Sequence, residues 1–406
     1  MKKFFKIASL LCLILALLLT AVACKETNHD TPKQTTPEET TPEEVTPEEA
    51  TPEETTPEEA TPEETTPEET TPEQTTPEEP ITPHVHSFGS WQNLNDLAEG
   101  EEGEQERICA CGEAETRTVC ASVGLAYRAN EEDGTCIITG PGECADTVLH
   151  VPAFINGYRV VSVWQSAFWR KDYLVEVSLP NTVLLVDYQA FSSCKSLESV
   201  SLPKNLENIE MSAFSSCTSL TSIVIPASVK SIFCSAFSGC DNLTSITVDA
   251  DNATFYAQGN CIIERATQTV VIACNTSVIP DGIEKIGEYS FADCNLMTSI
   301  DIPESVTTIE DDAFFSCRNL ENITIPQNVT SIGNGAFGGC ILLKSITIPA
   351  GVTNITSSVF RFCYSLETII FTGTTEQWNA ITLGKDWNMD VKVTEVICSD
   401  GVVPLN

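Results

Sequence analysis

Histidine, basic residues and long apolar runs are scarce in this 406-residue chain. Only four histidines are present, and His150 is the only one beyond residue 86. The sequence contains no phosphate-binding glycine loop and no nucleophile elbow. The one long apolar run lies at the start, and no later segment is apolar enough to cross a membrane. These features argue against an enzyme, and 21 basic against 58 acidic residues argue against a nucleic-acid partner.

The first residues have the pattern of an export signal. A basic start, Met1 to Lys6, precedes an apolar run from Ile7 to Ala23. The run ends Ala-Val-Ala-Cys24, which resembles the lipobox of bacterial lipoproteins, with Ala where Leu is usual. The resemblance implies a signal peptide over residues 1–23, a lipid on Cys24 and an anchor in the bacterial membrane at the cell surface. Two acyl chains would make such an anchor stable. A plain secretory signal is the alternative.

A repetitive acidic tract follows the signal. Between residues 31 and 83 the unit Thr-Pro-Glu-Glu recurs every five residues and contributes 17 Glu against one Lys. Frequent proline prevents a helix and like charges repel, so residues 24–83 are expected to form a disordered stalk. At about 3.1 Å per residue, the tract would reach at most about 160 Å from the anchor. An acidic interaction tail is the alternative reading of this tract.

A 23-residue period dominates the rest of the chain. Phenylalanine recurs with this step at 168, 191, 214 and 237, and again at 291, 314, 337 and 360. The aligned unit reads Ala-Phe-x-x-Cys-x-x-Leu-x-x-Ile-x-Ile-Pro-x-x-Val-x-x-Ile. A unit this short cannot bury its own apolar face, so the eight copies must stack into one core.

Each unit contains two strand signals. The part Leu-x-x-Ile-x-Ile alternates in polarity, as a strand with one buried face does, and the following proline ends it. The part Val-x-x-Ile returns along the opposite side, and Ala-Phe fills the turn. We therefore expect one continuous right-handed, β-rich solenoid over about residues 123–401, with a single buried row of phenylalanines from Phe191 to Phe360.

The repeat unit resembles the BspA-type leucine-rich repeats of bacterial surface proteins. Residues 156–160 are similar to the opening coil of that family, residues 250–280 to its inserted hairpin, and residues 371–401 to its closing coil. The resemblance implies a leucine-rich-repeat solenoid over residues 121–401, an insertion at about 249–279 and a short tail at 402–406. Members are generally adhesion or binding proteins, so the resemblance implies binding to a partner.

Seven cysteines follow the same period and form a cysteine ladder, which comprises Cys194, Cys217, Cys240, Cys294, Cys317, Cys340 and Cys363. Strands about 4.8 Å apart would allow disulfides between neighbours. An odd number and one repeated rotamer favour free, buried thiols instead. Zinc or an iron–sulfur cluster does not fit, because ligands must converge on a point and a ladder is a line.

A short module, residues 84–120, precedes the repeats. Its pattern His86-x-Phe88-x-x-Trp91, followed by an arginine and a Cys-Gly pair, resembles a short motif of many bacterial surface proteins. Four side chains, His84, His86, Cys109 and Cys111, would suit a structural zinc ion. The two cysteines are one residue apart instead of two, which favours the alternatives: a disulfide such as Cys109–Cys120, or simple reactive thiols. We expect no other cofactor.

The outward positions of the strands form a candidate binding face. These positions are Glu176, Ser178, Ser199, Ser201, Ser222, Val224, Ser245, Thr247, Ser299, Asp301, Asn322, Thr324, Ser345, Thr347, Thr368 and Ile370. Small hydroxyls are also ordinary solvent-facing strand residues, so the inserted hairpin and two late tryptophans, Trp378 and Trp387, compete as sites. The acidic run at 310–312 is typical of a solvated turn.

These patterns predict a surface-displayed binding or adhesion protein. It would be monomeric, displayed in many copies, and would contact an extracellular protein or glycan. It would meet the membrane only through its lipid. A structural envelope component or spacer without a specific ligand is the alternative.

Overall fold

The structure is a computed structural model, and it describes residues 88–89, 91–109 and 111–405, which belong to one compact unit. The signal peptide, Cys24, the stalk, His84 and His86 lie outside the described residues and remain predictions. Within the described residues, no helix is long and apolar enough to cross a membrane.

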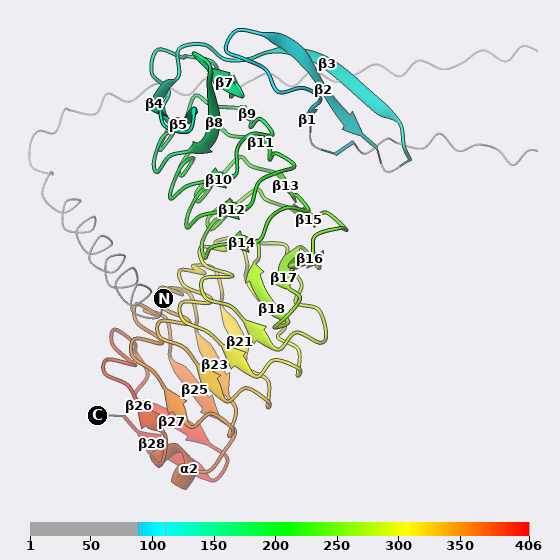
Figure 1. The fold of residues 1–406 in the computed structure, drawn as a ribbon. Helices are drawn as coiled ribbons and strands as arrows, with labels where there is room; N and C mark the ends of the chain where they lie inside the picture. Colours follow the sequence, from blue (N-terminus) through cyan, green and yellow to red (C-terminus); the bar gives the residue numbers. More distant parts are fainter. Residues whose placement is uncertain (1–87, 90, 110, 406) are drawn as a thin grey trace, which may run out of the picture. The chain divides into compact units, whose positions relative to one another are not determined.

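The module before the repeats is a small antiparallel sheet in the order β1-β2-β3. Its strands are β1 (Gln92–Asn93), β2 (Glu102–Ile108) and β3 (Ala114–Cys120). The long β2–β3 hairpin puts Gln105 opposite Arg117 and Arg107 opposite Glu115 on one face of the sheet (Figure 1).

The repeats form a solenoid with a strand on each of two sides, as the period predicts (Figure 1). The side that carries the Ile-x-Ile strands is called the strand face. It comprises β6 (Val148–His150), β9 (Glu176–Ser178), β11 (Ser199–Ser201), β13 (Ser222–Ile225), β15 (Ser245–Val248), β21 (Asn322–Thr324), β23 (Ser345–Ile348), β25 (Thr368–Phe371), β27 (Glu395–Cys398) and β28 (Gly401–Pro404).

The opposite side is called the return side. Its strands are β4 (Ala126–Asn130), β5 (Thr135–Gly140), β7 (Phe154–Ile155), β8 (Tyr158–Val163), β10 (Leu185–Val186), β12 (Asn208–Ile209), β14 (Ser231–Ile232), β19 (Lys285–Ile286), β20 (Thr308–Ile309), β22 (Ser331–Ile332), β24 (Asn354–Ile355) and β26 (Thr382–Leu383). Successive repeats pair in parallel at a 23-residue offset, as Ser222 with Ser245 and Asn322 with Ser345.

The turn around each Ala-Phe pair uses two residues in the left-handed region. Ser193 (φ 61°), Ser216 (φ 58°) and Gly339 (φ 76°) occupy the second of these positions in their repeats. Small and polar residues adopt this conformation more readily than bulky ones, which explains why serine and glycine recur there. The phenylalanine beside them is thereby directed into the core.

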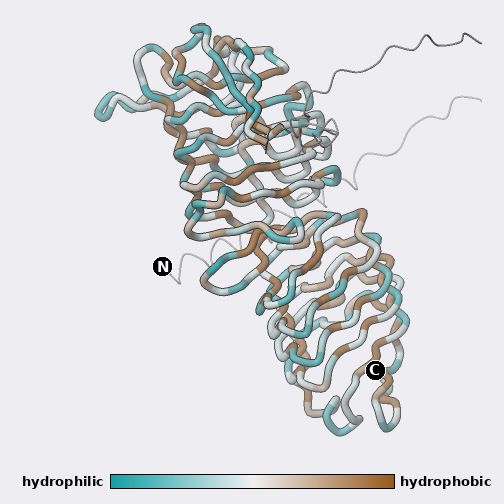
Figure 2. Tube along the Cα trace, turned by 90° about the vertical axis from the view of Figure 1, so that its right-hand side faces the viewer, coloured by the Kyte–Doolittle hydropathy of each residue, from teal (hydrophilic) through white to brown (hydrophobic). Residues whose placement is uncertain are grey.

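Phenylalanine rings stack through the core at the spacing of the strands. Ring centroids lie 5.1 Å apart between Phe168 and Phe191 and 5.5 Å apart between Phe314 and Phe337. All the predicted core phenylalanines are buried, so this part of the prediction is confirmed. Apolar segments accordingly lie in register from coil to coil in both halves (Figure 2).

The expectation of a single continuous row is wrong. One core cluster contains the phenylalanines from 168 to 237, and another contains those from 291 to 360. The segment between them, β16 (Phe255–Gln258), β17 (Cys261–Glu264) and β18 (Thr269–Ile272), is a three-stranded meander. Ile262 packs in the first core, whereas its neighbours Cys261 and Ile263 pack in the second. The insertion is therefore a wall buried on both faces.

The insertion also takes a place in the solenoid. Its last strand, β18, pairs in parallel with β19 on the return side. On the strand face, the next repeat has no strand at Ser299–Asp301, where the sequence predicts one. The strand face consists of three sheets, β6-β9-β11, β13-β15 and β21-β23-β25-β27-β28, and the insertion lies between the last two.

Candidate functional site

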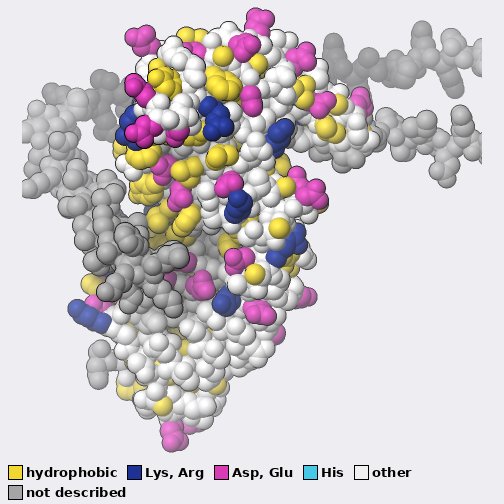
Figure 3. Space-filling view, in the orientation of Figure 1, with side chains coloured by type: hydrophobic (Ala, Val, Ile, Leu, Met, Phe, Trp, Pro, Cys, Tyr) yellow, Lys and Arg dark blue, Asp and Glu magenta, His cyan; other side chains and the backbone are white. Residues whose placement is uncertain are grey.

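The exposed part of the strand face lies in its middle and C-terminal repeats. Ser245, Thr247, Asn322 and Thr324 are exposed, as are Ser299 and Asp301 on the coil without a strand. Ser222, Val224, Ser345, Thr347 and Thr368 are half-buried. Few charged or hydrophobic side chains are visible over the C-terminal coils in Figure 3.

Two residues of the predicted face do not point into solvent. Ser178 is 1% exposed and Ser201 is 5% exposed, and Glu176 and Ser199 are half-buried. For Ser178 the physical reason is the β1–β3 module, which packs against the first repeats. The prediction that these positions are open to a ligand is wrong for Ser178 and Ser201.

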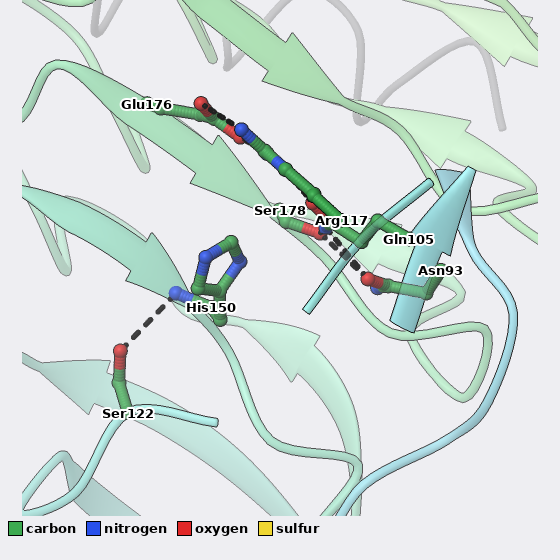
Figure 4. A network of polar contacts seen from close by, with 7 residues as sticks. All are labelled: Asn93, Gln105, Arg117, Ser122, His150, Glu176 and Ser178. Carbon is green, nitrogen blue, oxygen red and sulfur yellow. Dashed lines mark hydrogen bonds and ion pairs between the residues drawn. The ribbon is translucent and has the colours of Figure 1, made fainter. Parts of the chain in front are cut away.

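The module contacts β9 of the strand face through side chains on its inner surface. Arg117 forms a two-pronged ion pair with Glu176 (Figure 4). Gln105, which is fully buried, donates from Nε2 to Ser178 Oγ and to Asn93 Oδ1, both at 2.8 Å. Buried polar groups with complete hydrogen bonding fix an interface firmly. The module is thus an N-terminal cap of the solenoid.

Aromatic stacking holds the cap together. Arg107 and Arg117 lie over the ring of Trp91, with guanidinium carbons 4.6 and 4.4 Å from its centroid, and Arg107 also lies 4.9 Å from the Phe88 centroid. Cation–π contacts of this kind contribute about 0.5–1 kcal/mol each at partly exposed sites. Phe88 and Trp91 of the motif therefore have a structural role in this chain.

The cysteines of the cap do not support the disulfide alternative. Cys109 follows β2 at one end of the hairpin, and Cys120 ends β3 opposite Glu102 at the other end. Two cysteines a full seven-residue strand apart are too distant for a disulfide. Cys109 is buried and Cys111 is exposed. Among the described residues no group of His, Cys, Asp and Glu is arranged to hold a metal, but His84 and His86 are not among them.

His150 is the histidine next to the cap. Its backbone N–H donates to Ser122 Oγ at 3.1 Å, whereas its buried Nδ1 has no partner among the described residues (Figure 4). Burial lowers the pKa of this imidazole. The positive charge of Arg117 also lowers this pKa, whereas the negative charges of Glu176 and Asp146 raise it. At neutral pH the ring is therefore neutral, and it packs under the cap.

A hollow on the return side collects carboxylates from neighbouring repeats. It has a volume of about 290 Å³ and is lined by Glu288, Glu310 and Asp311, with Thr308 and Ser331. Asp312 lies beside this hollow. Burial raises the pKa of Asp312 to about 6, although a hydrogen bond from Tyr289 has the opposite effect. The expectation of a freely solvated turn at 310–312 holds for the exposed Asp311, but Glu310 and Asp312 are half-buried.

The cysteine ladder is buried, as predicted, and its thiols are free in the structure. Cys217 Sγ donates to the Phe191 carbonyl of the preceding repeat at 3.1 Å, and Cys340 Sγ to that of Phe314 at 3.2 Å. Burial raises the pKa of Cys240 to about 12. Cys194, Cys240, Cys317 and Cys363 make the same bond to the preceding repeat, a role that periodicity alone does not reveal.

The two late tryptophans do not form an open site. Trp378 is 2% exposed and Trp387 is 7% exposed. Trp378 lies on α2 (Thr375–Asn379), and its ring meets those of Phe371 and Trp387 edge to face. Together they close the C-terminal end of the core, so the proposal of these residues as competing surface sites is wrong.

The parallel coils, the buried phenylalanine rows and the exposed strand face define a leucine-rich-repeat solenoid. The chain matches the model of the BspA type leucine rich repeat region over residues 161–277 and 267–382, which together exceed half of its length. It belongs to this family. A search of curated protein sequences returned no match.

Solved structures of bacterial repeat proteins are similar to this chain. A leucine-rich cell surface protein from Faecalibacterium prausnitzii is 25% identical, with a TM-score of 0.41, over 64% of this chain and 96% of its own. A leucine-rich repeat protein from Eubacterium ventriosum is 21% identical, with a TM-score of 0.49, over 68% and 84%. One from Bacteroides ovatus is 25% identical, with a TM-score of 0.45, over 68% and 70%.

Proposed function

We propose that this protein is displayed at the cell surface and binds an extracellular protein or glycan through its strand face. The observation that carries the proposal is the exposed row at Ser245, Thr247, Asn322 and Thr324. These short, uncharged polar side chains lie on β15 and β21, and the coil between the two strands exposes Ser299 and Asp301. Extended sheet faces of this kind are where solenoids bind their partners. Binding, and not catalysis, is what such a surface supports.

The chemistry of the row suits many shallow contacts. Each hydrogen bond contributes on the order of 1 kcal/mol, so a single copy binds weakly. Many tethered monomers that engage one target surface would gain affinity by avidity. A long stalk on a lipid anchor would favour such display.

The direct test is saturable binding of the Cys24→Ser protein, which is expected to be released in soluble form, to target cells or to extracellular matrix. A binding protein gives a plateau that unlabelled protein competes away. A spacer, the alternative function, gives only a linear, non-competable signal, and that result would overturn the proposal.

The anchor is tested separately with Cys24→Ser. A lipid on the Cys24 sulfur cannot form on serine, so the variant should appear in the medium while the parent stays in the membrane fraction. Fractionation and immunoblotting measure this. Unchanged retention of Cys24→Ser would contradict a lipid anchor at this residue.

A further inference from the structure

The turn of the last phenylalanine repeat is aromatic and basic, as is that of the first repeat, where Arg170 lies over the Trp169 ring. After Phe360 it carries Arg361, Phe362 and Tyr364, which form an aromatic and basic cluster. The Arg361 guanidinium carbon lies 4.5 Å from the Phe362 ring centroid. The rings of Phe362 and Tyr364 lie 6.0 Å apart, with 47° between their planes. Tyr364 is 51% exposed, so the cluster opens to solvent.

The backbone under this cluster is strained. Phe362 has φ 65°, in the left-handed region that bulky side chains avoid. The same position holds small or short polar residues in six other repeats, namely Ser193, Ser216, Gly239, Asp293, Ser316 and Gly339, and Arg170 in the first repeat. The fold therefore does not need phenylalanine there. Strain that folding does not require is typical of functional positions.

The contacts of the Arg361 guanidinium leave it available to a ligand. Its Nε is enclosed without a hydrogen-bond partner, and it forms no ion pair with a described carboxylate. By contrast, Lys344 pairs with Glu321 and Lys392 with Glu367. The chain has a net charge of −37, yet the Arg361 guanidinium stacks on a ring and has no carboxylate partner among the described residues. It is therefore available to bind an external anion.

We propose that Arg361, Phe362 and Tyr364 bind a sugar ring that carries a carboxylate, as in the uronic acids of acidic polysaccharides. Aromatic faces are electron-rich, and the polarised C–H groups on one face of a sugar ring stack on them. The guanidinium N–H donors would take the carboxylate in a charge-assisted, bidentate pair. An acidic peptide side chain would use the arginine and leave the rings uncovered.

This site is separate from the strand face. It lies in the turn between β24 and β25, so its test involves none of the outward strand residues. Failure of one proposal therefore leaves the other standing.

The test is calorimetric titration of the full-length protein with a galacturonic acid hexamer. We expect saturable binding that weakens at least about tenfold for the methyl-esterified hexamer, since esterification removes the charge. Arg361→Gln and Tyr364→Ala should each weaken binding of the acidic hexamer by about tenfold or more. Leu296→Ala is the matched control, because Leu296 is 58% exposed on the same edge three repeats earlier, and it should bind as the parent does.

Phe362→Gly separates binding from folding. Glycine relieves the strained position, so the variant should melt at a higher temperature and yet bind the hexamer more weakly. A purely structural role for Phe362 would lower the melting temperature and leave binding unchanged.

Two results of the titration would overturn the proposal. One is no saturable binding of the acidic hexamer, or binding that Arg361→Gln leaves intact. The other is tighter binding of a Thr-Pro-Glu-Glu repeat peptide than of the hexamer, which would assign the site to an acidic peptide such as the stalk of a neighbouring copy.

Discussion

At the scale of single residues, the sequence period predicts which side chains are buried but not which distant residues they contact. The step of 23 residues predicted the buried positions of the phenylalanines and of the cysteine ladder, because a repeated position in a stack has a repeated environment. It gave no sign of the contacts of Arg117 and Gln105, which reach across 59 and 73 residues to the first repeat. The cross-strand pattern Gln105 with Arg117 and Arg107 with Glu115 was the available signal, but it required the hairpin register.

Asp312 gives the residue-scale prediction. Burial raises its pKa from 3.8 to about 6, so the folded protein binds a proton that the unfolded chain releases between these values. Its contribution to stability is therefore present below about pH 4 and is lost as the pH rises through about 6. We expect Asp312→Asn to stabilise the protein at pH 7.5 by on the order of 1 kcal/mol, reduced by partial exposure, and to have little effect at pH 4.

Urea melts at both pH values measure this difference. Asp311→Asn, at the exposed neighbour, is the control and should not stabilise, since Asp311 Oδ1 accepts a hydrogen bond from the Asn334 N–H at 2.7 Å. An Asp312→Asn variant that is less stable than the parent at pH 7.5 would contradict the assigned cost of burying this charge.

At the scale of elements, the strands and their turns were predictable, and the wall between the two cores was not. The runs Cys261 to Ile263 and Val270 to Ile272 are apolar on both faces, as strands buried on both sides are. The sequence predicted an inserted hairpin there and a competing binding site on it. Only the packing reveals that the meander completes the solenoid and divides its core.

The phenylalanine rows should be a major source of stability. Phe314 is fully buried between the rings of Phe291 and Phe337. We expect Phe314→Ala to destabilise the protein by about 3–5 kcal/mol in denaturant melts, because it leaves a large cavity. The half-buried neighbour Phe315 is the control, and Phe315→Ala should cost clearly less. A cost below about 1 kcal/mol for Phe314→Ala would mean that the row is not core.

The cap should depend on Arg117 more than on Arg107. Both lie over Trp91, but Arg117 pairs with Glu176 of the solenoid, whereas Arg107 pairs with Glu115 inside the hairpin. Arg117→Ala should therefore speed amide hydrogen exchange in β9 at the interface, since it leaves a half-buried carboxylate without its partner. Arg107→Ala should speed exchange in β2 and β3 only. Equal protection of β9 in both variants would contradict docking through this ion pair.

At the scale of the whole molecule, the sequence predicted a repeat solenoid and a binding role, and the family match supports both at the level of class. It did not predict how much of the strand face is open. Ser178 is covered because the cap, distant in sequence, packs on it, and such long-range contacts have no local signature. The exposed surface accordingly lies over β15 and β21 and over the coil between them.

The central claim is that this exposed surface binds the partner. The most direct measurement is adhesion of cells that display the triple variant Ser245→Arg, Asn322→Arg and Thr324→Arg, whose side chains are exposed on the strand face. The matched control places three arginines on the opposite side, at the exposed Thr307, Thr330 and Thr353 before β20, β22 and β24. Both variants should retain the melting temperature of the parent. We predict that the first loses adhesion and the control keeps it, and the reverse result would contradict recognition by the strand face.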